Sequence, residues 1–176
     1  MPDAPGLELI RGEIERDCPG AVLATSFDRN QAALIVDPER VLDALRWLKE
    51  QPGQRYDFLS SLHAADYLPA EPRFGVVYEL MCRERVERLR VRAALAEPAD
   101  GSLPELDSCV ELYPTAEFHE REVYDFFGIE FRGHPDLRRI LLPEVYEGWP
   151  LRRDFPVGGE PVIFTRDEPN VPRWFE

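Results

Sequence analysis

Two segments in the first third of the chain place apolar residues at the spacing of an amphipathic helix. The first helix is predicted over residues 6–17, where the buried positions would be Leu7, Ile10 and Ile14. The second is predicted to begin at Asp37-Pro38, because aspartate is a favourable N-cap and proline suits the first helical position. It would end at Pro52-Gly53, and its buried stripe would consist of Val41, Leu42, Leu45 and Leu48.

Short apolar runs bounded by turn residues predict a set of strands. The runs at 21–25 and 32–36 flank the polar turn 28–30 and predict a β-hairpin. Two further strand-like stretches cover 56–68 and 74–80. After a charged turn, the next predicted strand has one apolar and one solvated face, because Leu89, Val91 and Ala93 alternate with Arg88, Arg90 and Arg92. A loop is predicted at 98–104.

The pattern changes near residue 106, where helical spacing returns. The residues Leu106, Val110 and Tyr113 predict a short helix that Pro114 interrupts. Thr115 would cap a second helix over 116–127, with Val123 and Phe127 on its inner face. Gly128 is placed to end this helix in the left-handed conformation. Two i, i+4 ion pairs are predicted along it, Glu117 with Arg121 and Arg121 with Asp125.

These elements predict an α+β fold, a two-layer sandwich of a mostly antiparallel sheet with helices. We expect three parts: an α+β sandwich domain at 1–105, a helix with a charged segment at 106–156, and an extended Pro-rich C-terminal tail at 157–176. The sandwich domain is expected to fold independently. The tail is expected to be mobile without partners.

The charge and the cysteine content narrow the classes of function. The chain has 176 residues and a net charge of −13, which disfavours binding to nucleic acid or to an anionic lipid surface. The charge suits a protein partner with a basic face, or it serves solubility alone. The chain shows no signal peptide and no apolar run long enough to insert directly into a membrane. Its three separated cysteines indicate a reducing, cytoplasmic compartment: Cys18, Cys82 and Cys109.

The residues that could carry chemistry do not form a familiar site. No CxxC pair, phosphate-binding glycine loop or GxSxG motif occurs. One alternative is a free-standing metal enzyme that uses His119, Glu120 and His134, although their spacing is not that of HExxH. For His134, which precedes a proline, a local hydrogen bond in a turn is the simpler interpretation.

Residues 119–156 carry a denser pattern in two blocks. The first block is Glu120-Arg121-Glu122, Asp125, Phe126-Phe127, His134, Arg138 and Ile140-Leu141. The second is Gly148-Trp149-Pro150-Leu151-Arg152-Arg153-Asp154-Phe155-Pro156. With the strand at 74–80, they resemble the 30-kDa subunit family of respiratory complex I over roughly residues 56–165. The chain departs from the family's common His, Lys and Tyr at Trp149, Arg153 and Phe155, so no acid–base or ligand role is carried over to position 149.

The resemblance implies that this chain holds no catalytic, cofactor-binding or metal-binding residue. It implies instead a set of structural or subunit-interface residues, which we call the signature residues. They are Glu120, Arg121, Glu122, Asp125, Gly128, His134, Pro135, Arg138, Pro150, Arg152, Asp154 and Pro156.

The same resemblance implies a non-catalytic structural subunit in the hydrophilic arm of a proton-pumping NADH:quinone oxidoreductase. FMN, iron–sulfur clusters and quinone would lie in partner subunits. The partners would be chiefly the 49-kDa-type subunit and the cluster-bearing hydrophilic subunits. The location would be peripheral, on the cytoplasmic side of a bacterial membrane. An equivalent subunit of a membrane-bound hydrogenase, or of an F420H2- or ferredoxin-linked dehydrogenase, is the alternative.

Charge is balanced between residues 121 and 153, although the whole chain is acidic. Six arginines and six acidic residues alternate there among aromatic residues, which predicts a partly buried ionic network in place of a solvated helix face. Arginine and aromatic residues also concentrate in the cores of interfaces. We therefore expect residues 128–165 to lie extended across a partner subunit.

Overall fold

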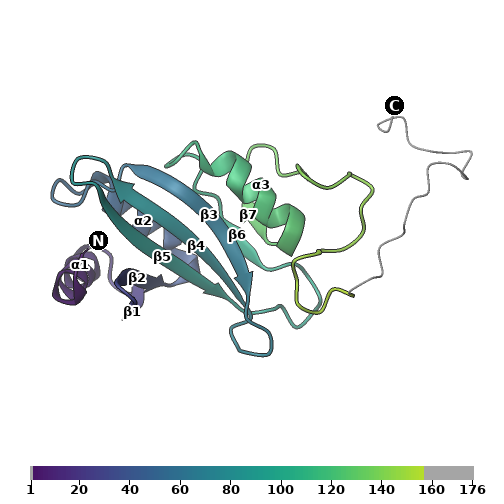
Figure 1. The fold of residues 1–176 in the computed structure, drawn as a ribbon, viewed down its shortest axis with the longest axis horizontal. Helices are drawn as coiled ribbons and strands as arrows, with labels where there is room; N and C mark the ends of the chain where they lie inside the picture. Colours follow the sequence, from purple (N-terminus) through teal and green to yellow (C-terminus); the bar gives the residue numbers. More distant parts are fainter. Residues whose placement is uncertain (1, 157–176) are drawn as a thin grey trace, which may run out of the picture.

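A five-stranded sheet with the order β1-β2-β5-β4-β3 organises the protein (Figure 1). The structure is a computed structural model, and it describes residues 2–156. The strands are β1 (Val22–Asp28), β2 (Gln31–Val36), β3 (Phe58–Asp66), β4 (Phe74–Cys82) and β5 (Glu87–Leu95). The predicted tail at 157–176 lies outside the described residues.

The sheet is mostly antiparallel, as predicted. Only β2 and β5 run parallel, and the other neighbouring strands are antiparallel. The β1–β2 hairpin is tight because Arg29 and Asn30 both adopt positive φ, at 49° and 60°. Two such residues give the turn a twist that matches the strands on either side. Strand β5 alternates as predicted, with its apolar residues buried and its arginines directed away from the core.

Three α-helices pack against this sheet: α1 (Ala4–Asp17), α2 (Val41–Glu50) and α3 (Ala116–Phe127). In Figure 1, α2 lies behind the sheet, α1 lies at its β1–β2 end, and α3 lies beside β3. Asp37 does cap the expected helix start, but the first turn is a 3-10 helix, η1 (Pro38–Arg40), that leads into α2. Leu42 is only half-buried, and Ala44 and Trp47 join the buried stripe. The α+β class is therefore confirmed.

The short helix predicted from Leu106, Val110 and Tyr113 is wrong. Strand β6 (Glu105–Asp107) occupies its start and pairs in parallel with β7 (Glu130–Arg132). Three apolar residues over eight positions fit a helix and an irregular buried segment equally well. The choice depends on a pairing partner about 25 residues later, and that partner satisfies the backbone groups of 105–107.

One continuous core joins residues on both sides of position 105. Leu106, Val123 and Phe127 belong to the same buried cluster as the strands of the main sheet. The Tyr113 hydroxyl donates a hydrogen bond of 2.8 Å to the carbonyl of Tyr56. Within residues 2–156, no helix has the length and apolar character needed to cross a membrane. The division at 105 remains a prediction about folding, and the shared core limits how independent the two parts can be.

A fragment of residues 1–105 keeps the main sheet with α1 and α2, and we expect it to fold. Its midpoint of urea unfolding should be lower than that of a 1–156 fragment, because it lacks part of the common core. Circular dichroism during urea titration of the two fragments measures the difference. Equal midpoints would show that the second part adds no stability to the first.

Candidate functional site

Helix α3 holds a buried carboxylate near its start. Glu120 is fully buried, and it accepts hydrogen bonds from the Ser108 hydroxyl at 2.6 Å and the Cys109 backbone N–H at 2.8 Å. Burial raises the pKa of Glu120, although these hydrogen bonds oppose the shift. Thr115 precedes the helix but makes no side-chain cap, because its hydroxyl donates to the carbonyl of Leu59 on β3 at 3.3 Å. These contacts fix α3 on the loop after β6 and on the sheet edge.

A second buried carboxylate, Asp125, organises the chain that follows the helix. We call residues 133–156 the strap. Asp125 Oδ2 accepts hydrogen bonds from three successive backbone N–H groups, at 3.1, 2.8 and 2.9 Å, while its Oδ1 accepts one of 2.8 Å from Arg139. The three N–H groups belong to Ile140, Leu141 and Leu142. Burial would raise the pKa of Asp125, but these donors outweigh it and lower the pKa.

Arginines of the strap region bind mainly backbone carbonyls of this chain. The predicted pairs of Arg121 with Glu117 and Asp125 are wrong, because Arg121 donates to the carbonyls of Arg138 and Arg139 at 3.2 and 3.3 Å. Arg152 similarly donates to the carbonyl of Phe127 at 2.6 Å. A carbonyl at a helix end or in irregular chain has no intrahelical partner, so a guanidinium with several donors satisfies it well. The charged segment thus holds the strap against its own helix.

Gly128 ends α3 as predicted, with φ of 65° and ψ of 42°. A Cβ atom at this position would lie 2.6 Å from Cδ2 of the Trp149 indole. The indole also packs edge-on against Tyr124 and lies under the guanidinium of Arg139, at 4.6 Å from the ring centre. Trp149 therefore covers the end of the helix as a packing residue, and it needs glycine beneath it.

The three residues of the alternative metal site do not converge. His134 Nδ1 accepts from the Asp136 N–H, so its Nε2 carries the proton and donates to the Glu117 carbonyl at 3.0 Å. Glu120 is occupied by Ser108 and Cys109. Across residues 2–156, no group of three or more His, Cys, Asp and Glu side chains could hold a metal ion. His134 shapes the turn at the start of the strap, as the simpler interpretation predicted.

The far end of the strap is fixed by Arg73, a residue that the sequence did not single out. Its guanidinium is only 2% exposed and contacts Asp66 at 2.9 Å, Glu97 at 2.7 Å and Asp154 at 2.6 Å. Burial would raise the pKa of Asp66, but donors on Arg73, Arg153 and Leu68 lower it to about 2. The signature residue Asp154 thus binds the sheet through Arg73.

The other signature residues lie at or near the surface. Arg138 is exposed and pairs with Asp136 at 2.9 Å, and Pro150 is half-buried. Glu122, Pro135 and Pro156 are exposed. An interface role for these residues stays a prediction. Their exposure leaves them available for contact with another chain.

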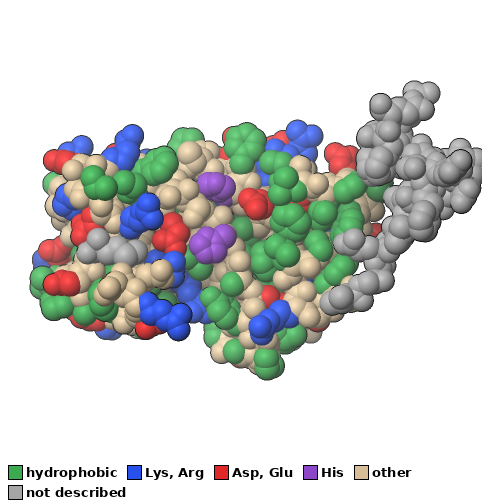
Figure 2. Space-filling view, in the orientation of Figure 1, with side chains coloured by type: hydrophobic (Ala, Val, Ile, Leu, Met, Phe, Trp, Pro, Cys, Tyr) green, Lys and Arg blue, Asp and Glu red, His purple; other side chains and the backbone are tan. Residues whose placement is uncertain are grey.

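Three apolar residues of the strap are exposed, among charged residues such as Glu144 and Glu147. Leu141, Val145 and Leu151 are exposed by 61%, 77% and 53%. In Figure 2, hydrophobic side chains gather on the part of the surface formed by α3 and the strap. Contiguous exposed apolar surface of this kind marks a site of protein contact.

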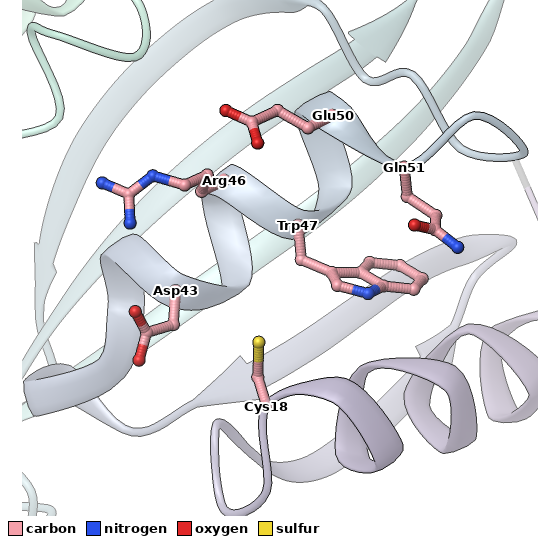
Figure 3. Close-up of a pocket in the computed structure, with 6 residues that line it drawn as sticks. All are labelled: Cys18, Asp43, Arg46, Trp47, Glu50 and Gln51. Carbon is pink, nitrogen blue, oxygen red and sulfur yellow. The ribbon is translucent and has the colours of Figure 1, made fainter.

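A separate hollow of about 280 Å³ lies between the end of α1 and one face of α2 (Figure 3). Cys18 and Trp47 line it with polar residues of α2, and the Trp47 indole N–H donates to Asp17 at 2.7 Å. Burial, Asp43 and Asp17 raise the pKa of the Cys18 thiol. A raised pKa disfavours the nucleophilic thiolate form of Cys18.

Replacing Asp125 by Asn should lower the free energy of unfolding by about 3 kcal/mol, because it leaves the partly buried Arg139 and part of the N–H cluster without their buried anion. Urea unfolding measures the loss. Asp136→Asn is the matched control, because its pair with Arg138 is exposed and should be worth under about 1 kcal/mol. Equal effects of the two substitutions would contradict the role of Asp125.

Stability should also fall in acid. The pKa of Asp66 is lowered to about 2 in the fold, against about 3.9 in an unfolded chain. Its contribution, about 2.6 kcal/mol, is present above the unfolded pKa of about 3.9 and is lost as the pH falls through the folded value of about 2. The free energy of unfolding, measured by urea titration from about pH 5 to about pH 2, should decline less steeply in Asp66→Asn than in the unmodified chain. Parallel curves would exclude Asp66 as a source of the decline.

Gly128→Ala should destabilise the chain by about 1–3 kcal/mol, from the left-handed backbone and from displacement of Trp149. In a Trp149→Ala background the same change should cost only the backbone part, about 1 kcal/mol. Thermal or urea unfolding of the unmodified chain, the two single variants and the double variant gives the coupling free energy between positions 128 and 149. Additive effects would mean that the indole does not press on residue 128.

Comparisons with known proteins place this geometry in a family. The model of the respiratory-chain NADH dehydrogenase 30-kDa subunit matches residues 34–161, which include most of the sheet, α3 and the strap. The C-type subunit of NADH-quinone oxidoreductase from Roseiflexus castenholzii is 41% identical over 162 residues, covering 92% of this chain and 91% of that protein. The protein of the same name from Rhodobacter capsulatus is 39% identical, covering 87% of this chain and 74% of that protein.

Solved structures agree with the sequence relatives. A trypsin-resistant fragment (1–134) of Nqo5 superposes with a TM-score of 0.59 at 30% identity, covering 74% of this chain and 98% of the fragment. A chain of the membrane-bound sulfane sulfur reductase, an archaeal respiratory membrane complex, gives 0.67 at 27% identity and 85% coverage of both chains. The chain described here belongs to the 30-kDa subunit family of respiratory-chain NADH dehydrogenase.

Proposed function

We propose that this chain is a non-catalytic structural subunit in the hydrophilic arm of a proton-translocating NADH:quinone oxidoreductase. The observation that carries the proposal is the similarity, over nearly the whole chain, to proteins named as the C-type subunit of NADH-quinone oxidoreductase. The complex would pass electrons from NADH through FMN and iron–sulfur clusters to quinone. This chain would support the subunits that hold those groups.

The side chains of the site support a structural role in place of a catalytic one. Glu120, Asp125 and His134 have side chains that could act as acids or bases, and each is held by hydrogen bonds within the chain. A side chain held in this way positions the backbone and is not free to exchange a proton with a substrate. FMN, the iron–sulfur clusters and quinone are therefore assigned to partner subunits.

The strap is the proposed interface with those partners, chiefly the 49-kDa-type subunit and the cluster-bearing hydrophilic subunits. Its inner side packs on α3 of this chain, so a partner would cover the outer side, where Leu141, Val145 and Leu151 are exposed. The part of the segment 128–165 beyond 156 lies outside the described residues. The location would be peripheral, on the cytoplasmic side of a bacterial membrane.

A second candidate is an equivalent subunit of a related membrane-bound complex, such as a hydrogenase or an F420H2- or ferredoxin-linked dehydrogenase. The similarity to a chain of the archaeal sulfane sulfur reductase favours this class, because the fold then occurs in more than one kind of respiratory membrane complex. The higher identity to the NADH-quinone oxidoreductase relatives, 41% against 27%, favours the first proposal.

Affinity purification of the tagged chain from membranes in mild detergent tests the proposal. We expect stoichiometric recovery of a 49-kDa-type subunit with flavin- and cluster-bearing subunits, and NADH-dependent quinone reduction. A partner with nickel-site cysteines and no NADH-binding subunit would favour the alternative. Recovery of the chain alone, at its full cellular abundance, would contradict both.

A further inference from the structure

A groove of about 330 Å³ lies between β3 and α3. Strand β3 supplies residues 61–64, α3 supplies His119, Glu122, Val123, Phe126 and Phe127, and Leu151 closes one end. We call it the β3–α3 groove. Figure 2 shows histidine side chains near the middle of this face, and His63 and His119 both line the groove. Its volume is at the lower limit for small-molecule pockets and suits one or two side chains of another protein.

Two polar groups in the groove have no partner within residues 2–156. His119 Nδ1 is buried there without a hydrogen bond. Glu122 is exposed, and none of the described ion pairs includes it. A buried ring nitrogen without a partner is costly, so an occupant that hydrogen-bonds to it would be favoured.

The charge of the groove favours a basic occupant. Partial burial and Arg90 lower the pKa of His63 despite the nearby Glu79, and the lowered pKa disfavours its charged form. Arg90 itself is paired with Glu79 at 2.6 Å. Glu122 is then a negative charge without an ion pair among the described residues, at a groove that also holds apolar side chains and two histidines, on a chain of net charge −13. An acidic segment would be repelled, and an apolar one would bury Glu122 without a partner.

Resting on the proposed function, we propose that the β3–α3 groove receives an arginine side chain from a neighbouring subunit of the complex. Its aliphatic stem would lie along Leu62, Val123 and Phe126, and its guanidinium would pair with Glu122. The planar guanidinium has a further N–H for His119 Nδ1, which accepts when the proton is on Nε2. A lysine would supply the positive charge, but it lacks the planar group whose separate N–H donors could reach both Glu122 and His119 Nδ1.

Photo-crosslinking in the assembled complex tests the occupant. Ser61, which lines the groove, is replaced by p-benzoylphenylalanine in the full chain, and the complex is purified from membranes and irradiated. We expect one dominant crosslinked peptide, from a neighbouring subunit and containing an arginine. A crosslink only within this chain, a partner peptide without arginine, or no crosslink in a complex that assembles would overturn the groove proposal. In each case, co-purification of the partner subunits would still support the proposed function.

Charge reversal tests the contact itself. Glu122→Arg should lower the fraction of chain retained in the complex at least tenfold at moderate salt, while Glu111→Arg, at another exposed position outside the groove, should not. Exchanging the crosslinked arginine for glutamate should restore retention of the Glu122→Arg chain. Equal losses of retention for Glu122→Arg and Glu111→Arg would contradict an ion pair between Glu122 and the partner's arginine. So would a failure of the exchanged glutamate to restore retention. Matching thermal midpoints of the isolated variants show that folding is unaffected.

Discussion

The hydrogen bonds around Asp125 are the constraint on which the second half of the structure depends. One carboxylate oxygen receives three consecutive backbone N–H groups, and the other receives Arg139, which in turn lies against Trp149. A buried anion of this kind is stable only when all its donors are in place together. The irregular chain after α3 therefore has one defined path, although it contains almost no regular secondary structure.

Much of the fold was predictable because its signals are local. The hairpin turn, the alternating strand β5, the cap at Asp37 and the left-handed Gly128 each follow from a few neighbouring residues. The error at Leu106–Tyr113 has the opposite origin. The pairing of β6 with β7 is a tertiary event, and three apolar residues cannot signal it.

The contacts of the signature residues were not predictable from the sequence. The family pattern marks Asp125 and Asp154, but their partners Arg139 and Arg73 lie outside it, and Arg73 is 81 residues from Asp154. Helical spacing also suggested partners for Arg121 that it does not take, because exposed i, i+4 pairs are weak and unsatisfied carbonyls nearby compete for the same donors. Most charged side chains of α3 and the strap are therefore bound within this chain. Exposed apolar residues and Glu122 remain available for contact with other chains.

The contacts of Arg73 also bear on the order in which the chain acquires its structure. Asp66 and Arg73 are seven residues apart, at the facing ends of β3 and β4, so the hairpin can form their pair early. Asp154 reaches the same guanidinium only after a loop of 81 residues has closed. We therefore expect the strap to dock late, so that a nascent chain would present its sheet before the surface on which assembly would depend.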